Sequence, residues 1–277
     1  MLTIAQITDL HLTTPHDPLN HARNEQRLRQ VLRSIHALRP RPVAIMASGD
    51  LVDHGEPEEY AELKAILAEA DIPIYFAMGN HDRRAPFLET FADAGVQLDD
   101  HGLVQYAVDF EGLRMVVCDT LEEGKDRSGF DAERAAWLAK TLDADPLTPT
   151  VVFMHHPPIL SGVRWMDPDP SAPWIGQLAE VLTGRDQVRA VLCGHVHRAF
   201  HGLLAGHVVA TSPATSIQVT LDLTEVDMEH PDGREILVAE PPGYTLVMAD
   251  AGRVTTHTCV AGDFAPAVAY TRPFHQD

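Results

Sequence analysis

Short apolar runs alternate with segments of helical periodicity through the first two-thirds of this 277-residue chain. The runs have the length and composition of strands and cover residues 2–8, 43–48, 72–77, 113–118, 150–154 and 190–193. Between them, apolar residues recur at helical spacing within residues 28–38, 60–67, 137–142 and 175–182. Alternation of this kind is typical of α/β proteins with largely parallel strands. The sequence therefore predicts an α/β fold.

The pattern changes after residue 200, where strand-like segments follow one another without long helices between them. They cover residues 207–211, 216–221, 244–248 and 253–259, and residues 250–252 predict a hairpin turn between the last two. Residues 222–243 are polar and predict a surface excursion, either a lid edge or an oligomer contact. Residues 262–277 form a tail without clear periodicity. Because there is no internal repeat and no low-complexity linker, we expect one domain spanning residues 1–277.

Composition narrows the classes of partner. The net charge of −19 argues against a surface for nucleic-acid polymers, which needs clustered Lys and Arg. It does not exclude an anionic substrate, because bound dications set the local field. The chain opens directly into a strand-like run, and no apolar stretch approaches the length of a membrane span. We therefore expect a cytoplasmic protein without a membrane partner.

Metal-donor side chains follow five of the apolar runs. They supply carboxylate, amide and imidazole groups, and the seven are Asp9, His11, Asp50, Asn80, His155, His195 and His197. This mixture suits ions such as Mn, Fe or Zn better than ions that prefer thiolates. Seven donors exceed one tetrahedral site and match two ions that share a bridging carboxylate. The set indicates two-metal hydrolysis of a phosphate ester.

The donors stand near the carboxyl ends of the expected strands, which is the edge where open α/β sheets bind ligands. Gly49, Gly79 and Gly194 immediately precede three of the clusters, where tight turns or close backbone approach are needed. Asp9 and His11 are two residues apart, as are two of the later histidines, so each pair could chelate one ion or be divided between two.

Each cluster taken alone also has an ordinary explanation. Gly49-Asp50 could be a turn, and Asn80-His81-Asp82 could cap a helix. His155-His156 could end a solvent-facing strand, and the His195 and His197 pair could hold a structural zinc ion. Jointly these explanations are weak, because they require five coincidences in the order that a metal site needs.

The ordered motifs are recognisable. Asp-x-His, Gly-Asp, Gly-Asn-His-Asp, His-x-Pro and Gly-His-x-His, within residues 9–197, resemble the calcineurin-like metallophosphoesterase superfamily. Residues 154–158, followed by Met166-Asp167, and residues 55–60 resemble its bacterial class III cyclic nucleotide and glycerophosphodiester phosphodiesterase branch. The resemblance implies a four-layer α/β-β/α sandwich of two mixed sheets flanked by helices, with a dinuclear metal site at the carboxyl ends of strands.

The same resemblance implies roles for individual residues. One metal would be held by Asp9, His11, Asp50 and His197, and the other by Asp50, Asn80, His155 and His195, with Asp50 bridging. His81 would contact the phosphate together with Asn80 and would protonate the leaving oxygen. His156 would not be a ligand. The catalytic residues would thus be His81 and Asp50.

The expected reaction is hydrolysis of a phosphodiester by attack of a metal-bound hydroxide on phosphorus. The substrate class implied is 3′,5′-cyclic nucleotides, glycerophosphodiesters or both, and the two metals would be Fe, Mn or Zn. Arg164 and Asp167 are candidates for the pocket wall, although an ordinary surface loop would explain them as well. Two alternatives stay open: a phosphomonoesterase or nucleotidase on the same site, and a non-catalytic metal-binding scaffold. We also expect a homo-oligomer, a dimer or higher.

Overall fold

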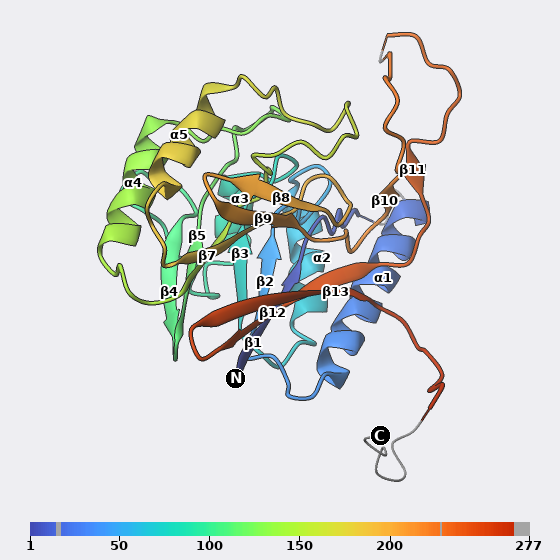
Figure 1. Ribbon diagram of the computed structural model, residues 1–277. Helices are drawn as coiled ribbons and strands as arrows, with labels where there is room; N and C mark the ends of the chain where they lie inside the picture. The colour runs from blue at the N-terminus through green and yellow to red at the C-terminus, as the bar shows by residue number, and fades with distance from the viewer. Residues whose placement is uncertain (15–17, 228, 269–277) are drawn as a thin grey trace, which may run out of the picture.

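Two large mixed sheets form the centre of the protein (Figure 1). The computed structural model describes residues 1–14, 18–227 and 229–268. The first sheet has the order β13-β12-β1-β2-β3, in which β1, β2 and β3 are parallel and β12 and β13 are antiparallel to their neighbours. Its strands are β1 (Leu2–Ile7), β2 (Ala44–Ser48), β3 (Ile74–Ala77), β12 (Gly243–Asp250) and β13 (Arg253–Val260).

The second sheet has the order β4-β5-β6-β7-β9-β8, with four parallel strands in its middle and an antiparallel strand at each edge. Its strands are β4 (Tyr106–Phe110), β5 (Leu113–Val117), β6 (Thr150–Phe153), β7 (Val188–Cys193), β8 (His201–Leu204) and β9 (His207–Thr211). A short pair, β10 (Gln218–Val219) and β11 (Leu237–Val238), lies apart from both sheets.

Helices cover the outer sides of the two sheets. They are α1 (Pro18–Ala37), α2 (Pro57–Leu67), α3 (Arg84–Thr90), α4 (Ala132–Asp143) and α5 (Pro173–Leu182). The apolar faces of α1, α2 and α3 join the main core with the first sheet, as the rings of Phe76 in β3 and Phe87 in α3 illustrate at 5.4 Å. Helices α4 and α5 form a second core with the outer face of the second sheet.

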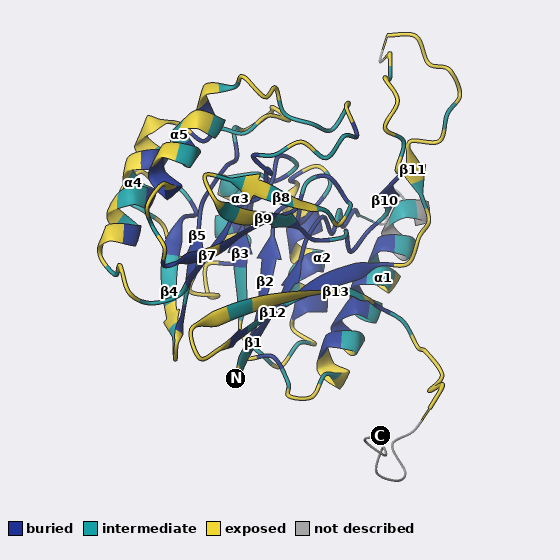
Figure 2. Cartoon of the chain, viewed as in Figure 1, coloured by how far each residue is buried: buried dark blue, intermediate teal, exposed yellow. Residues whose placement is uncertain are grey.

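Strands β5 and β6, in the middle of the second sheet, are buried on both faces, and the middle of this sheet is dark blue in Figure 2. In β6, Val151 and Phe153 point into the main core, whereas Val152 and the following Met154 point toward α4 and α5. A fully buried side chain of this size contributes roughly 1.5–3 kcal/mol. Burial on both faces explains why these strands read as continuous apolar runs.

The predicted α/β fold, with two mixed sheets flanked by helices, is confirmed. The hairpin turn is confirmed as well, because Ala251 and Gly252 both have positive φ, as a two-residue type I′ loop requires. Other details differ from the expectation. The expected strand at 216–221 shrinks to two residues, and β4, β8 and α3 lack a clear apolar pattern because they lie at sheet edges or are short.

The greater part of the expected excursion, residues 222–227 and 229–236, lies between β10 and β11 and projects away from the body of the protein in Figure 1. Its role as a lid edge or an oligomer contact stays a prediction. The last part of the expected tail, residues 269–277, lies outside the described residues. Among the described residues, no helix is both long and apolar enough to cross a membrane.

Candidate metal centre

The carboxyl ends of five strands, three from the first sheet and two from the second, deliver all seven predicted donors to one edge of the sandwich. The loops after β1, β2 and β3 carry Asp9 and His11, Asp50, and Asn80, respectively. The loops after β6 and β7 carry His155 and the pair His195 and His197. The carboxyl ends of parallel strands share one edge, so distant segments converge there.

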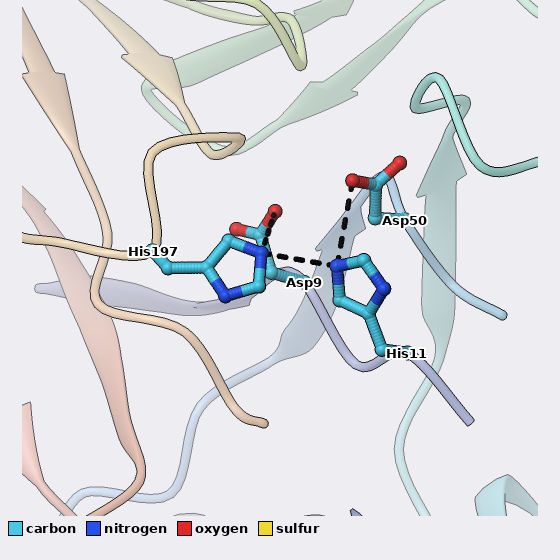
Figure 3. Close-up of side chains that lie close together, drawn as sticks. All are labelled: Asp9, His11, Asp50 and His197. Carbon is cyan, nitrogen blue, oxygen red and sulfur yellow. Dashed lines mark hydrogen bonds and ion pairs between the residues drawn. The ribbon is translucent and has the colours of Figure 1, made fainter. Parts of the chain in front are cut away.

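The first cluster contains Asp9, His11, Asp50 and His197, each with a ligand atom within 4.8 Å of the others (Figure 3). The Nε2 atoms of His11 and His197 lie 3.0 Å apart. His11 Nε2 is 3.5 Å from Asp50 Oδ2, and His197 Nε2 is 3.5 Å from Asp9 Oδ1. The four donors therefore form a group that could hold one metal ion.

The second cluster contains Asp50, His155 and His195, again within 4.8 Å of one another. Asn80 joins it through Oδ1, which is 3.2 Å from His155 Nε2 and 3.0 Å from His195 Nδ1. Asp50 Oδ2 is 3.2 Å from His155 Nε2. Asp50 is therefore a member of both clusters.

Hydrogen bonds fix which ring nitrogens are available to a metal. His11 Nδ1 is 2.7 Å from Asp53 Oδ1, and His197 Nδ1 is 2.6 Å from the carbonyl oxygen of Ile217. An ionised carboxylate and a carbonyl can only accept, so both Nδ1 atoms donate and both Nε2 atoms of neutral rings carry lone pairs. Two lone pairs facing each other repel, whereas a cation between them is stabilised. The donor set therefore fits a metal ion.

Burial and neighbouring charges shift the pKa values of several donors. Burial opposes protonation of His155, yet the adjacent Asp50 carboxylate outweighs it and raises the pKa of His155 to about 9. Burial likewise works to raise the pKa of Asp50, but His155 and His11 hold that pKa well below its ordinary value. Burial raises the pKa of Asp9 to about 6 and lowers the pKa of His195 to about 3.

Five of the donors adopt a backbone conformation that non-glycine residues rarely use. The φ angles are +50° for Asp9, +42° for His11, +48° for Asp50, +71° for His195 and +54° for His197. Each such residue costs about 1–3 kcal/mol and persists only where its surroundings fix it. The loops are fixed to one another here, since the amides of Leu10 and His11 both donate to the Asp50 carbonyl. Strain gathered in this way is a mark of a functional site.

The glycines that precede three clusters have no room for a side chain. A Cβ on Gly79 would collide with the backbone and carboxylate of Asp50, and one on Gly194 would collide with Thr8. Gly49 has a φ of +95°, and a Cβ there would meet the ring of His155. The close backbone approach expected from the sequence is present at all three positions.

His156, next to a predicted ligand, has both ring nitrogens engaged elsewhere. Nδ1 lies 2.8 Å from Thr120 Oγ1, and Nε2 lies 3.2 Å from the carbonyl oxygen of Asp126. The side chain is buried, and its ring lies 4.8 Å from the ring of His195, but both of its nitrogens are bonded to the 119–130 loop. Its neighbour His155 instead uses Nδ1 toward the Ser48 carbonyl at 3.0 Å, which leaves Nε2 for the cluster.

Two further carboxylates, Asp53 and Asp82, support the donors, and the sequence alone indicated no role for them. The Asp53 carboxylate holds His11, and the Asp53 carbonyl oxygen lies 2.7 Å from His81 Nδ1. Asp82 is fully buried and accepts from backbone amides on both sides of the site. Their closeness in sequence to the donors could have indicated this role, because each lies within three residues of a predicted donor in the same loop.

Five of the seven donors line a cleft of about 1490 Å³, namely His11, Asp50, Asn80, His195 and His197. Its floor includes His81 and Asn80, and its walls come from three parts of the chain. The wall residues include Asn20, Arg23 and Asn24 of α1, the 126–131 loop, and Trp165, Asp167 and Trp174. The sequence did not predict that α1 forms part of the cleft wall, because only the packing of the folded chain places its first turns beside the donors.

The two residues expected in the pocket wall are placed differently. Asp167 lines the cleft, although its carboxylate also accepts from the amides of Ser161 and Gly162 at 2.6 and 2.9 Å. Arg164 is exposed and pairs with Glu225 of the 222–243 excursion. It is not among the described residues that line the cleft.

Comparison with known proteins finds a matching family and several proteins of similar sequence. The sequence model of the family described as calcineurin-like phosphoesterase matches residues 2–199. A protein of Arcobacter nitrofigilis named probable glycerophosphodiester phosphodiesterase is 31% identical over 265 residues, covering 95% of this chain and 94% of that protein. A protein of Rhodopseudomonas palustris named probable cyclic nucleotide phosphodiesterase is 32% identical over 260 residues, covering 91% and 90%, respectively.

Comparison of the fold with solved structures agrees with the sequence comparison. The crystal structure of a dimetal phosphatase from Danio rerio matches with a TM-score of 0.64 at 16% identity, covering 94% of this chain and 99% of that one. At this identity the likeness concerns the fold alone. The family match spans most of the chain, and both relatives exceed 30% identity over nearly their whole length. This chain therefore belongs to the calcineurin-like phosphoesterase family.

Proposed function

We propose that this protein is a metal-dependent phosphodiesterase that hydrolyses small phosphodiesters, namely glycerophosphodiesters, 3′,5′-cyclic nucleotides or both. The observation that carries the proposal is the position of Asp50, which belongs to two donor clusters and lines the cleft. The names of the two relatives, a glycerophosphodiester and a cyclic nucleotide phosphodiesterase, support the substrate class.

In this proposal one ion is held by Asp9, His11, Asp50 and His197, and the other by Asp50, Asn80, His155 and His195. The oxygen and imidazole donors favour Mn, Fe or Zn. Two such ions, when bound, supply Lewis acidity toward the phosphoryl oxygens and lower the pKa of water toward neutrality. The neutral amide of Asn80 limits the negative charge of the cluster, which preserves that Lewis acidity.

His81 is the proposed acid for the leaving oxygen. Its Nδ1 donates to the Asp53 carbonyl, so Nε2 is the nitrogen available to a substrate in the cleft. Burial opposes protonation of this ring, but the Asp50 carboxylate and the Asp53 carbonyl outweigh it and raise the pKa of His81. A protonated ring that is half-exposed at the cleft floor can donate a proton to an alkoxide as it departs.

The organisation of the chain belongs to the same proposal. Residues 1–277 are proposed to act as one domain, because β1 near one end pairs with β12 near the other. The 222–243 excursion is proposed as an oligomer contact of a cytoplasmic homo-oligomer. Exposed Leu223 and Leu237, at 56% and 45%, support a contact there.

A substrate panel on protein of measured metal content tests the proposal. Manganese-loaded protein should hydrolyse bis(p-nitrophenyl) phosphate, a cyclic nucleotide and a glycerophosphodiester faster than p-nitrophenyl phosphate. A preference for the monoester would replace the proposal with a phosphomonoesterase. Failure of protein with two bound ions to hydrolyse any ester would favour a metal-binding scaffold.

A further inference from the structure

Tyr60 of α2 is fully buried behind the donor clusters and has a hydroxyl with two hydrogen bonds. The hydroxyl donates to Asp82 Oδ1 at 3.1 Å and accepts from the amide of Arg83 at 2.8 Å. Its ring packs edge-on against Phe87 at 5.7 Å, which holds the side chain in place. The hydroxyl is therefore a fixed link between α2 and the loop after β3.

Asp82 connects the Tyr60 hydroxyl to the two loops that carry Asp50 and Asn80. Its Oδ2 accepts from the amide of Gly79 at 2.8 Å, and its carboxylate accepts from the amide of Leu51 at 3.2 Å. Leu51 directly follows Asp50, and Gly79 directly precedes Asn80. The carboxylate thus sets the spacing between the proposed bridging ligand and the proposed amide ligand.

The two loops are also in direct contact at this point. The amide of His81 donates to Asp50 Oδ1 at 2.9 Å, and Gly79 lies so close to Asp50 that a Cβ would collide with it. A small shift of one loop is therefore transmitted to the other. Tyr60 is not among the described residues that line the cleft, so any effect it has on catalysis is indirect.

We propose that Tyr60 is a positioning residue that sets the geometry of the Asp50, Asn80, His155 and His195 cluster through Asp82 and the Arg83 amide. The inference rests on the proposed function for its consequences in turnover. Its consequences for metal binding are independent of any substrate.

Tyr60→Phe removes only the hydroxyl and keeps the ring packing. Asp82 then loses one of its donors, and the Arg83 amide loses its acceptor, so the loops after β2 and β3 move relative to each other. Loss of a supporting hydrogen bond behind a metal ligand typically weakens metal affinity or activity tenfold to a hundredfold. We expect a loss of this size at the cluster that contains Asn80, and a smaller one at the cluster that contains His11 and His197.

Tyr106→Phe is a matched control. The hydroxyl of Tyr106 donates to the Phe76 carbonyl at 2.8 Å and accepts from the Phe76 amide at 2.9 Å, so it also has two hydrogen bonds. The residue is buried as well, with 6% exposure, but it contacts β3 itself rather than the loop that follows it. Both variants should lower the melting temperature, but only Tyr60→Phe should weaken metal binding. The comparison therefore separates a general loss of stability from a change in the geometry of the cluster.

The experiment is a titration of the full-length metal-free protein with Mn²⁺, followed by calorimetry and by electron paramagnetic resonance. Wild type and Tyr106→Phe should bind two ions and give the spectrum of a coupled pair. Tyr60→Phe should bind its second ion with a Kd at least about tenfold higher. Its kcat at limiting Mn²⁺ should fall with KM unchanged, and excess Mn²⁺ should restore part of that kcat.

Unchanged Mn²⁺ affinity in Tyr60→Phe would overturn the inference, as would equal losses in both tyrosine variants. If Tyr60→Phe does not fold, Asp82→Asn takes its place, because it weakens the same link from the other side. Wild type that binds two ions without hydrolysing any phosphodiester would contradict the proposed function alone, and the affinity comparison would still decide the role of Tyr60.

Discussion

Asp50 Oδ2 lies 3.2 Å from His155 Nε2, and this contact joins the two sheets at the candidate metal centre. Asp50 follows β2 of the first sheet, and His155 follows β6 of the second. Both side chains are buried, at 2% and 0% exposure, so neither can exchange its partner for water. Neither sheet alone contains a complete donor set, and the centre exists because the sheets pack face to face.

Asp50→Asn should remove both metal ions and the activity together. The substitution keeps the size of the side chain but removes the charge shared by the two clusters. We expect metal affinity to fall by more than the tenfold to hundredfold that is typical of supporting residues, since Asp50 is a proposed ligand. Metal content by mass spectrometry and turnover of bis(p-nitrophenyl) phosphate measure the two effects.

Asp119→Asn is the control for burying an amide in place of a carboxylate. Asp119 is fully buried and pairs with Arg84 at 2.7 Å, away from both clusters. Its replacement should cost about 1–3 kcal/mol of stability and leave the metal content unchanged. Full metal content in Asp50→Asn would show that Asp50 does not bridge the ions.

Metal binding should release a proton near neutral pH. The pKa of His155 is raised to about 9 in the metal-free protein, so its ring is protonated at pH 7 and must lose that proton before Nε2 can bind a metal. Apparent affinity should therefore rise with pH by about tenfold per unit between pH 7 and 8.5 and level off above pH 9. Calorimetry in two buffers of different ionisation enthalpy counts the protons released, and a count of zero at pH 7 would contradict this assignment.

His81→Ala should keep both metals and lose mainly turnover. His81 lies close to His11 and Asp53 but belongs to neither of the two clusters that contain Asp50, and its Nδ1 is bonded to the Asp53 carbonyl. Loss of a general acid lowers kcat by about 10²–10⁴-fold. The loss should be smaller for p-nitrophenol esters, whose leaving group needs little protonation, than for alkyl esters. Equal loss of metal and activity would mean that His81 is a ligand.

Arg198 should support His197 from behind. Its guanidinium donates to the Val219 carbonyl at 2.9 Å and pairs with Glu240 at 3.1 Å, which fixes the segment whose Ile217 carbonyl orients the His197 ring. Arg198→Ala should weaken Mn²⁺ binding at the first cluster about tenfold. Stability should change little, because partly exposed ion pairs contribute up to about 1 kcal/mol.

Arg234→Ala is the matched control within the excursion. Arg234 pairs with Asp222 and Asp232, and neither of those contacts reaches the segment that holds His197. Its loss should leave Mn²⁺ affinity unchanged. If both arginine variants bind Mn²⁺ like wild type, the Ile217 carbonyl does not depend on the Arg198 contact.

Local signals in the sequence were sufficient for the parts of the site that lie at strand ends. The apolar runs fixed where β1, β2, β3, β6 and β7 end, and the donors that follow those ends needed no further information. Edge strands such as β4 and β8 escaped detection because they are only partly buried and so lack a continuous apolar pattern. The wall contributed by α1 escaped because no local rule relates residues 20–24 to loops more than a hundred positions away.

The sequence by itself determined the kinds of donor, their order and the class of fold, since these follow from residue chemistry and from hydrophobic periodicity. The tertiary structure alone decided which ring nitrogens point into the clusters and that Asp50 is shared by two of them. It also decided that both nitrogens of His156 are bonded to the 119–130 loop, whereas His155 keeps Nε2 for the cluster. It also decided that Tyr60 stands behind the centre. The physical reason is that these are distances between residues remote in the chain, and only the packing of one sheet on the other sets them.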